Sequence, residues 1–268
     1  MKMTAFIFLF IFASLLFCQN FKEIDLSKIF KGHNGAFVLY NQTDNLYYKY
    51  NIVRCRQRFL PASTFKIPNS LIGLETKVIR DSNYVIKWSG KQEPIKEWER
   101  DHTLKSAIYF SVVPYYQELA RRVRRSRMQY WLNKINYGNK SIGSRIDRFW
   151  LDNSLKISAD EQLEFLNKFH NYKLPFSKRS IDIVKAILPE EKIGDAIIRS
   201  KTGTGKIGDN HFIGWLVGFI KEGANVYYFA FNIEGKNYEE AMKLRNEIPT
   251  KLNDLNTYKH SKLSKFIR

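Results

Sequence analysis

The sequence predicts an α/β (α+β) fold: one antiparallel sheet flanked by helices, with a helical lobe inserted between its sheet segments. Residues 35–40 and 46–50 have the composition of strands, and the turn-forming residues 41–45 separate them. Three further strand patterns follow residue 193, whereas apolar residues recur at helical spacing in the middle of the chain. Strands at both ends that enclose a helical middle favour a single sheet completed by both halves of the chain.

The composition is that of one globular domain. The chain has 268 residues, and 44% of them are hydrophobic, which is enough for one large domain with its own core. We assign residues 20–268 to this domain and about 68–190 to the inserted helical lobe. After removal of the N-terminal segment only Cys55 remains, so we expect the core to hold the fold without an internal disulfide.

Residues 1–19 have the pattern of a secretory signal peptide. Lys2 gives a basic lead, and residues 5–17 are apolar apart from one serine. That run is short for a bilayer span, and no later run is long enough. We therefore predict a periplasmic protein with no membrane span after signal removal. Cys18 is an alternative site for a lipid anchor, but the preceding Phe17 favours simple cleavage.

The chain is strongly basic, with a formal net charge of +18. One interpretation is nucleic-acid binding, and the other is a solvated basic helix face. Predicted export and the lack of a zinc-finger or RNA-binding signature favour the second, so we expect no nucleic acid as a partner. The positive field can also concentrate an anionic substrate. The basic cluster consists of Arg121, Arg122, Arg124, Arg125 and Arg127.

The remaining elements follow from periodicity and turn residues. The clearest helical windows are residues 101–110, 114–133 and 158–172, and a closing helix covers 238–255. The C-terminal strands are expected over residues 196–201, 211–221 and 225–233, with turns at 203–208 and 222–223. The sequence gives no indication of the oligomeric state.

The segment around Ser63 carries the first chemical signal. Apolar residues follow it at helical spacing, so Ser63 is expected near the first turn of an apolar helix. Lys66 lies three residues later and shares a helix face with it, which allows the amine to meet the hydroxyl. A serine beside a base at a helix start is what nucleophilic catalysis requires. An N-cap serine with a solvated lysine is the alternative.

The triplet Lys201-Thr202-Gly203 is expected at the end of a strand. Together with an upstream Ser-x-x-Lys motif, it is typical of serine β-lactamases and penicillin-binding proteins. The lysine and threonine can bind a substrate carboxylate, and the glycine allows close approach to the backbone. Alone, the triplet is a common turn motif.

From about residue 35 to the C-terminal helix, the chain resembles the class D (oxacillinase-type) serine β-lactamases, and the resemblance implies the serine β-lactamase/penicillin-binding fold. The matching segments occur in the family's order, and Leu244-Arg245 resembles a further element that receives the substrate carboxylate. The five matches are Ser63-Thr64-Phe65-Lys66, Ser111-Val112-Val113, Tyr137-Gly138-Asn139, Phe149-Trp150-Leu151-Asp152 and Lys201-Thr202-Gly203.

The resemblance implies a specific catalytic machinery. Ser63 would attack the β-lactam carbonyl, and Lys66 would carry a carboxyl group derived from carbon dioxide (N6-carboxylysine), held by the Trp150 indole. An apolar pocket favours the neutral amine that this modification needs. Phe65 and Leu151 are candidates for that pocket, together with Val113 and Trp150.

The remaining roles are also implied by the resemblance. Ser111 would carry a proton to the lactam nitrogen with help from Lys201, and the backbone N–H groups of Ser63 and Thr204 would form the oxyanion hole. The residues implied in substrate binding are Val113, Lys201, Thr202, Gly203 and Arg245. Tyr137-Gly138-Asn139 is assigned a structural role. Taken singly, Ser111 is equally a helix start and Trp150 equally a core residue.

Two features separate this chain from related patterns. Glu164 resembles the deacylating glutamate of class A enzymes, but a capping box of Ser158 and Glu161 starts a helix there, so we expect Glu164 on its surface. Asn153-Ser154 replaces the more usual glycine-containing loop of class D, which leaves the loop shape open.

The predicted function is therefore β-lactam hydrolysis with no metal and no cofactor other than carbon dioxide, since no histidine or cysteine cluster has metal-ligand spacing. The first alternative is a penicillin-binding transpeptidase or a β-lactam sensor domain, which acylates without turnover. The second is a basic binding protein without enzymatic activity. The sequence does not distinguish among penicillins, cephalosporins and carbapenems.

Overall fold

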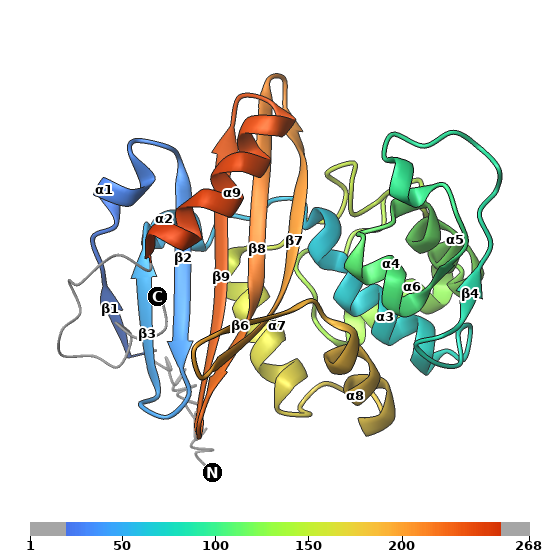
Figure 1. Cartoon of the computed structure of the whole chain (residues 1–268), viewed down its shortest axis with the longest axis horizontal. Coiled ribbons are helices and arrows are strands. Elements are labelled where there is room, and N and C mark those ends of the chain that lie inside the picture. Colours follow the sequence, from blue (N-terminus) through green and yellow to red (C-terminus); the bar gives the residue numbers. More distant parts are fainter. Residues whose placement is uncertain (1–19, 253–268) are drawn as a thin grey trace, which may run out of the picture.

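The computed structural model describes residues 20–252, with a seven-stranded sheet at its centre (Figure 1). The strand order is β1-β3-β2-β9-β8-β7-β6. β2 pairs with β9, so both halves of the chain complete one sheet, as the sequence predicts. The strands are β1 (Phe21–Glu23), β2 (Gly35–Asn41), β3 (Leu46–Tyr50), β6 (Glu190–Ile193), β7 (Ala196–Gly208), β8 (His211–Glu222) and β9 (Asn225–Gly235).

The sheet is antiparallel except at one edge, where β1 pairs with β3 in parallel. The connection explains this one parallel pair. The chain passes from β1 through the short helix α1 (Ser27–Phe30) and then through β2 before it reaches β3.

Helices cover both faces of the sheet. α9 (Tyr238–Leu252) crosses one face, and α7 (Ala159–His170) packs on the other, while α3 to α6 lie together beside the β7 side (Figure 1). Two hydrophobic cores result, one under α1 and α9 and a larger one that joins the sheet to the other helices. The remaining helices are α2 (Ile52–Cys55), η1 (Ala62–Phe65), α3 (Lys66–Glu75), η2 (Lys96–Trp98), α4 (Leu104–Tyr109), α5 (Val113–Val123), α6 (Arg125–Lys134) and α8 (Lys178–Ile187).

The position of β2 in the middle of the sheet, buried on both faces, explains its apolar sequence. Successive side chains of a strand point to opposite faces. Val38 accordingly lies in the larger core, whereas Phe37 and Leu39 lie in the core under α1 and α9. A strand buried on both faces needs apolar residues at every position, which explains the unbroken run at residues 36–40.

Three predicted elements need correction. Residues 203–208 are not a turn but the continuation of β7, because they pair with β8 as far as Gly208. Residues 114–133 form two helices, since Arg124 adopts a left-handed φ of 69° between α5 and α6. Residues 102–103 form the strand β5 (His102–Thr103), paired with β4 (Val85–Ile86), before α4 begins.

Other predicted elements agree closely. The return strand at 46–50 and the start of α7 are as expected, and Ser158 and Glu161 form the predicted capping box. The predicted signal peptide at residues 1–19, Cys18 within it and the last residues of the predicted 238–255 helix lie outside the described residues. None of the helices within residues 20–252 combines the length and the apolar character that crossing a bilayer requires.

Tyr137-Gly138-Asn139 fastens the irregular segment of residues 145–157 to the body of the protein. Asn139 Nδ2 donates to Ser154 O at 2.8 Å, and Asn139 Oδ1 accepts from Lys156 N at 2.9 Å. Gly138 has a φ of +52°, and a Cβ there would lie 2.1 Å from Lys156 O. Only glycine combines this backbone conformation with so close an approach.

We therefore expect Gly138→Ala to destabilise the protein by more than the roughly 1 kcal/mol that left-handed backbone strain alone costs. Gly90→Ala is the matched control, because Gly90 also has a positive φ but no atom within 4 Å of the added Cβ. Urea unfolding of both variants measures the difference. Equal losses of unfolding free energy would contradict this account of Gly138.

Candidate active site

Ser63 and Lys66 meet at the junction of η1 and α3, as their spacing predicts. Lys66 Nζ donates to Ser63 Oγ at 2.7 Å. The lysine is fully buried at 0% exposure, whereas Ser63 is partly exposed. The nucleophile candidate is thus accessible from outside while its neighbouring amine is shielded from water. The alternative of a solvated lysine is therefore wrong.

Burial lowers the pKa of Lys66 well below its usual value, and the nearby charge of Lys201 lowers it further. Both effects disfavour the charged amine. Tyr116 contributes to the enclosure, since Lys66 Nζ lies 5.4 Å from the centre of its ring. Tyr116 is itself fully buried and its hydroxyl is hydrogen-bonded to Ser70 Oγ at 2.9 Å.

Trp150 reaches the same junction from the 145–157 segment. Its carbonyl accepts from Ala62 N at 3.1 Å, and its ring stacks on Phe65 at 5.6 Å between ring centres. The side chain is fully buried, yet Nε1 has no hydrogen-bond partner among the described residues. Buried indole N–H groups are usually hydrogen-bonded, so this N–H is available to an acceptor. Leu151, the next residue, packs partly buried against the same core.

β7 runs past this junction with its outer edge toward η1. β6 pairs with β7 only as far as Arg199, so β8 is the only described strand that pairs with β7 beyond it. Gly203 faces the nucleophile: a Cβ there would lie 2.9 Å from Pro61 O and 3.1 Å from Ser63 N. Glycine is therefore needed for the close approach of the two backbones.

Lys201-Thr202-Gly203 lies in the middle of β7 rather than at a strand end, which corrects the prediction. Lys201 is 2% exposed and donates from Nζ to Thr202 O at 3.0 Å. Burial, with a smaller effect from the charge of Arg245, lowers the pKa of Lys201 to about 7. Arg245 extends from α9 to the same strand, where Nη1 donates to Thr204 Oγ1 at 2.8 Å.

Ser111 and Val113 flank the start of α5. Ser111 is partly exposed and adopts a left-handed φ of 55°. Val113 is the first residue of the helix, and a proline occupies its first turn. The left-handed turn holds Ser111 outside the helix, and no hydrogen bond occupies its hydroxyl within residues 20–252. It is therefore not a helix cap.

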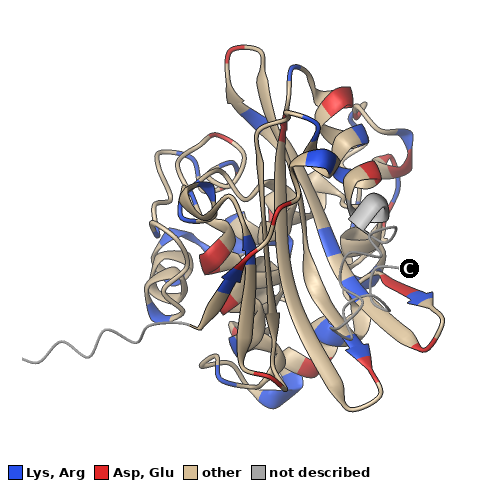
Figure 2. Ribbon diagram, turned by 90° about the vertical axis from the view of Figure 1, so that its left-hand side faces the viewer, with Lys and Arg blue, Asp and Glu red and all other residues tan. Residues whose placement is uncertain are grey.

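Glu164 and the five arginines of the basic cluster, which are predicted to have no catalytic role, lie on the surface. Glu164 is exposed and pairs with Lys168, one turn further along α7, as predicted. All five arginines of the basic cluster are exposed. Figure 2 shows basic residues over helices, strands and loops alike, with acidic residues among them.

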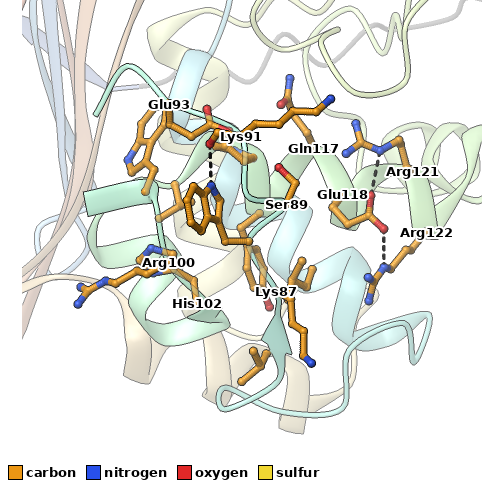
Figure 3. Close-up of a pocket in the computed structure, with 17 residues that line it drawn as sticks. Lys87, Ser89, Lys91, Glu93, Arg100, His102, Gln117, Glu118, Arg121 and Arg122 are labelled. Atoms are coloured by element: carbon orange, nitrogen blue, oxygen red, sulfur yellow. Dashed lines mark hydrogen bonds and ion pairs between the residues drawn. The ribbon is translucent and has the colours of Figure 1, made fainter. Parts of the chain in front are cut away.

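A cavity of about 560 Å³ lies between residues 85–100 and α5 (Figure 3). Val112 and Pro114 line it, but the predicted site residues do not. Figure 3 shows Glu118 between Arg121 and Arg122, and the ion pairs measure 3.0 and 2.8 Å. This cavity is therefore separate from the Ser63 site.

Sequence reasoning missed Tyr116 as a neighbour of Lys66. A signal for it was present, because Tyr116 lies in the first turn of the helix predicted over residues 114–133, directly after Ser111-Val112-Val113. The sequence also carried no signal for the contact between Gly203 and the Ser63 turn, which joins segments far apart in the chain. Among the described residues, no group of three His, Cys, Asp or Glu side chains is placed to hold a metal ion.

Comparisons with known proteins agree with this geometry. The penicillin-binding protein transpeptidase domain matches residues 31–254. The chain is 45% identical to β-lactamase OXA-19 of Pseudomonas aeruginosa over 82% of this chain and 83% of that protein. It is also similar to the class D β-lactamase FUS-1 (OXA-85) of Fusobacterium nucleatum subsp. polymorphum, with 40% identity, a TM-score of 0.81 and coverage of 87% of this chain and 97% of that one.

A penicillin receptor is a further structural relative. The C-terminal domain of the BlaR penicillin-receptor of Bacillus licheniformis is 34% identical, with a TM-score of 0.83 and coverage of 88% of this chain and 96% of that domain. The identity to the two β-lactamases is higher, and it extends over most of the chain. With a serine and a buried lysine in hydrogen-bond contact beside a Lys-Thr-Gly strand, the chain belongs to the class D serine β-lactamases, within the penicillin-binding transpeptidase fold.

Proposed function

We propose that this protein hydrolyses the amide bond of penicillin-type β-lactams through an acyl-enzyme on Ser63, and so confers resistance to these antibiotics. One observation carries the proposal: a fully buried amine lies 2.7 Å from Ser63 Oγ. Burial favours the neutral amine, and a base within hydrogen-bond distance activates a serine as a nucleophile. Membership of the family supports a β-lactam as the substrate.

Lys66 is proposed to carry a carboxyl group as N6-carboxylysine. Its neutral amine would form a bond to the carbon of carbon dioxide and release one proton, so the depressed pKa of Lys66 favours the modification. The unpartnered Trp150 N–H supports this proposal, because it offers the hydrogen bond that a carbamate oxygen accepts. When present, the carbamate supplies an anionic proton acceptor for Ser63 and for the hydrolytic water.

The open edge of β7 is proposed to hold the substrate. The N–H groups of Ser63 and Thr204 would stabilise the oxyanion as the bond from Ser63 Oγ to the lactam carbon forms. Lys201, Thr202 and Arg245 would bind the substrate carboxylate. The close packing of Gly203 on Ser63 supports this arrangement, since it brings that edge against the nucleophile.

The lactam C–N bond then breaks, and its nitrogen must gain a proton. Ser111 is proposed to deliver it with help from Lys201, whose pKa of about 7 suits proton transfer near neutral pH. Val113 would line the substrate site beside Ser111. The proposal includes no metal and no cofactor other than carbon dioxide.

Export to the periplasm is part of the proposal and is supported by the apolar run at residues 5–17. A penicillin sensor is the second candidate function, since the receptor domain shares the fold. Acylation without turnover would distinguish a sensor from a hydrolase, and no acylation at all would favour a basic binding protein.

Intact mass spectrometry after exposure to benzylpenicillin tests the function directly. We expect one penicilloyl adduct on Ser63 that forms and then disappears as product accumulates. Ser63→Ala should form none, whereas Ser126→Ala, an exposed serine on α6, should behave as the wild type. A stable adduct would indicate a sensor, and an adduct on another residue would refute the assignment of Ser63.

The carbamate predicts a dependence on carbon dioxide. Enzyme depleted of carbon dioxide should lose most of its activity, and bicarbonate should restore it. Lys66→Ala should lower kcat by about 10²- to 10⁴-fold, the usual contribution of a general base, and bicarbonate should not rescue it. Steady-state hydrolysis of a chromogenic cephalosporin measures both effects. Full activity without carbon dioxide would exclude the carbamate.

Carbamate formation on Lys66 also predicts how the carbon dioxide requirement of the enzyme changes with pH. As pH falls through the depressed pKa of Lys66, the amine takes up a proton and can no longer bind carbon dioxide. The concentration of dissolved carbon dioxide needed for half-maximal activity should therefore rise toward acid pH. Rates measured at fixed dissolved carbon dioxide over a pH series provide the test, and a requirement that does not change with pH would contradict it.

A further inference from the structure

Asn153 belongs to the pair Asn153-Ser154, at which the loop after Trp150 departs from the more usual class D pattern. It adopts a left-handed φ of 66°, a conformation that glycine adopts freely and asparagine tolerates. Its side chain forms a hydrogen bond within the protein, since Nδ2 donates to Lys206 O on β7 at 3.0 Å. The Asn153 side chain thus forms a hydrogen bond between two segments that meet at the candidate active site.

The acceptor of this bond, Lys206 O, lies on the open edge of β7, the edge that does not pair with β8. In an antiparallel strand, the backbone groups of alternate residues face the same edge. Lys206 therefore presents its backbone on the same side as Thr204, whose N–H is the proposed oxyanion donor. β8 is the only described strand that pairs with β7 there. The Asn153 side chain therefore binds the unpaired edge of β7 at Lys206, two residues beyond Thr204.

The donor of the bond lies three residues after Trp150. Trp150 is attached to the nucleophile turn through Ala62 N, at 3.1 Å, and its indole is the proposed partner of the modified lysine. Ser154, on the other side of Asn153, is held at its carbonyl by Asn139 at 2.8 Å. The loop is thus fixed at both ends without Asn153, and Asn153 adds the attachment to β7.

We propose that Asn153 is a positioning residue that fixes the loop of residues 150–154 relative to β7, the strand of the proposed oxyanion donor Thr204. By fixing this loop, Asn153 would set both the affinity of Lys66 for carbon dioxide and the rate of deacylation. This inference rests on the proposed function and deepens it. Deacylation requires the base held by Trp150 and the acyl carbonyl held by β7 to keep a fixed separation. The bond from Asn153 to Lys206 joins the loop of Trp150, the proposed partner of the base, to the strand of Thr204, the proposed oxyanion donor.

The test uses Asn153→Gly, which tolerates the left-handed backbone and removes the side chain that forms the bond. Asn153→Asp is a second variant, because a carboxylate of the same size cannot donate to Lys206 O. Asn210→Gly is the matched control: Asn210 also has a positive φ, of 54°, but lies exposed in the β7–β8 turn. Binding of ¹³C-labelled carbon dioxide to Lys66 is followed by NMR, and acylation and deacylation are followed separately by rapid-quench mass spectrometry.

We expect both Asn153 variants to need about threefold to tenfold more carbon dioxide for half-occupancy of Lys66, the effect of one hydrogen bond. Deacylation should slow by a similar factor, acylation should change less, and Asn210→Gly should match the wild type. Loss of thermal stability with unchanged carbon dioxide affinity and deacylation would overturn the positioning role. A wild-type enzyme that turns over without any carbamate signal would overturn the proposed base and this inference together.

Discussion

The burial of the Lys66 amine against the Ser63 hydroxyl is the constraint on which the site depends. An isolated ammonium loses its hydration when it is buried, so the protein interior favours the neutral form. Lys201, which is also buried, adds a second cation nearby and increases the cost of charging Lys66. The rings of Phe65, Trp150 and Tyr116 surround this junction. The apolar packing of the fold therefore sets the chemical state of the base.

That packing brings together segments from very different places in the chain. A backbone hydrogen bond from Ala62 N to Trp150 O attaches the Ser63 turn to the 145–157 segment, whereas the Asn153 side chain attaches that segment to β7. Gly203 shows how tight the assembly is, since any side chain there would meet the backbone of Pro61 and Ser63. Backbone contacts depend on the course of the chain more than on side-chain identity, which suits a site that must keep its geometry.

The sequence was sufficient for features that depend on local spacing. The Ser63–Lys66 contact requires only one helical turn, and the α7 capping box only four consecutive residues. Prediction from the sequence failed where strand pairing in the folded protein overrides the local preference of the residues. The glycines after Lys201 are typical of a turn, yet pairing with β8 keeps them in a strand. The break at Arg124 has no glycine or proline to mark it. The bond from Asn153 to Lys206 joins residues far apart in sequence.

A shared fold cannot by itself separate a hydrolase from a penicillin receptor, because both need a nucleophile and an oxyanion hole to become acylated. The difference must lie in what removes the acyl group, namely a base and a water held at the acyl carbonyl. In this chain Trp150 is the proposed partner of the base, and its loop is attached to β7 as well as to the nucleophile turn. A loop attached on one side only would leave acylation possible, since Ser63 and Thr204 do not belong to it. On the proposed mechanism, deacylation is therefore the step that depends most on how this loop is held.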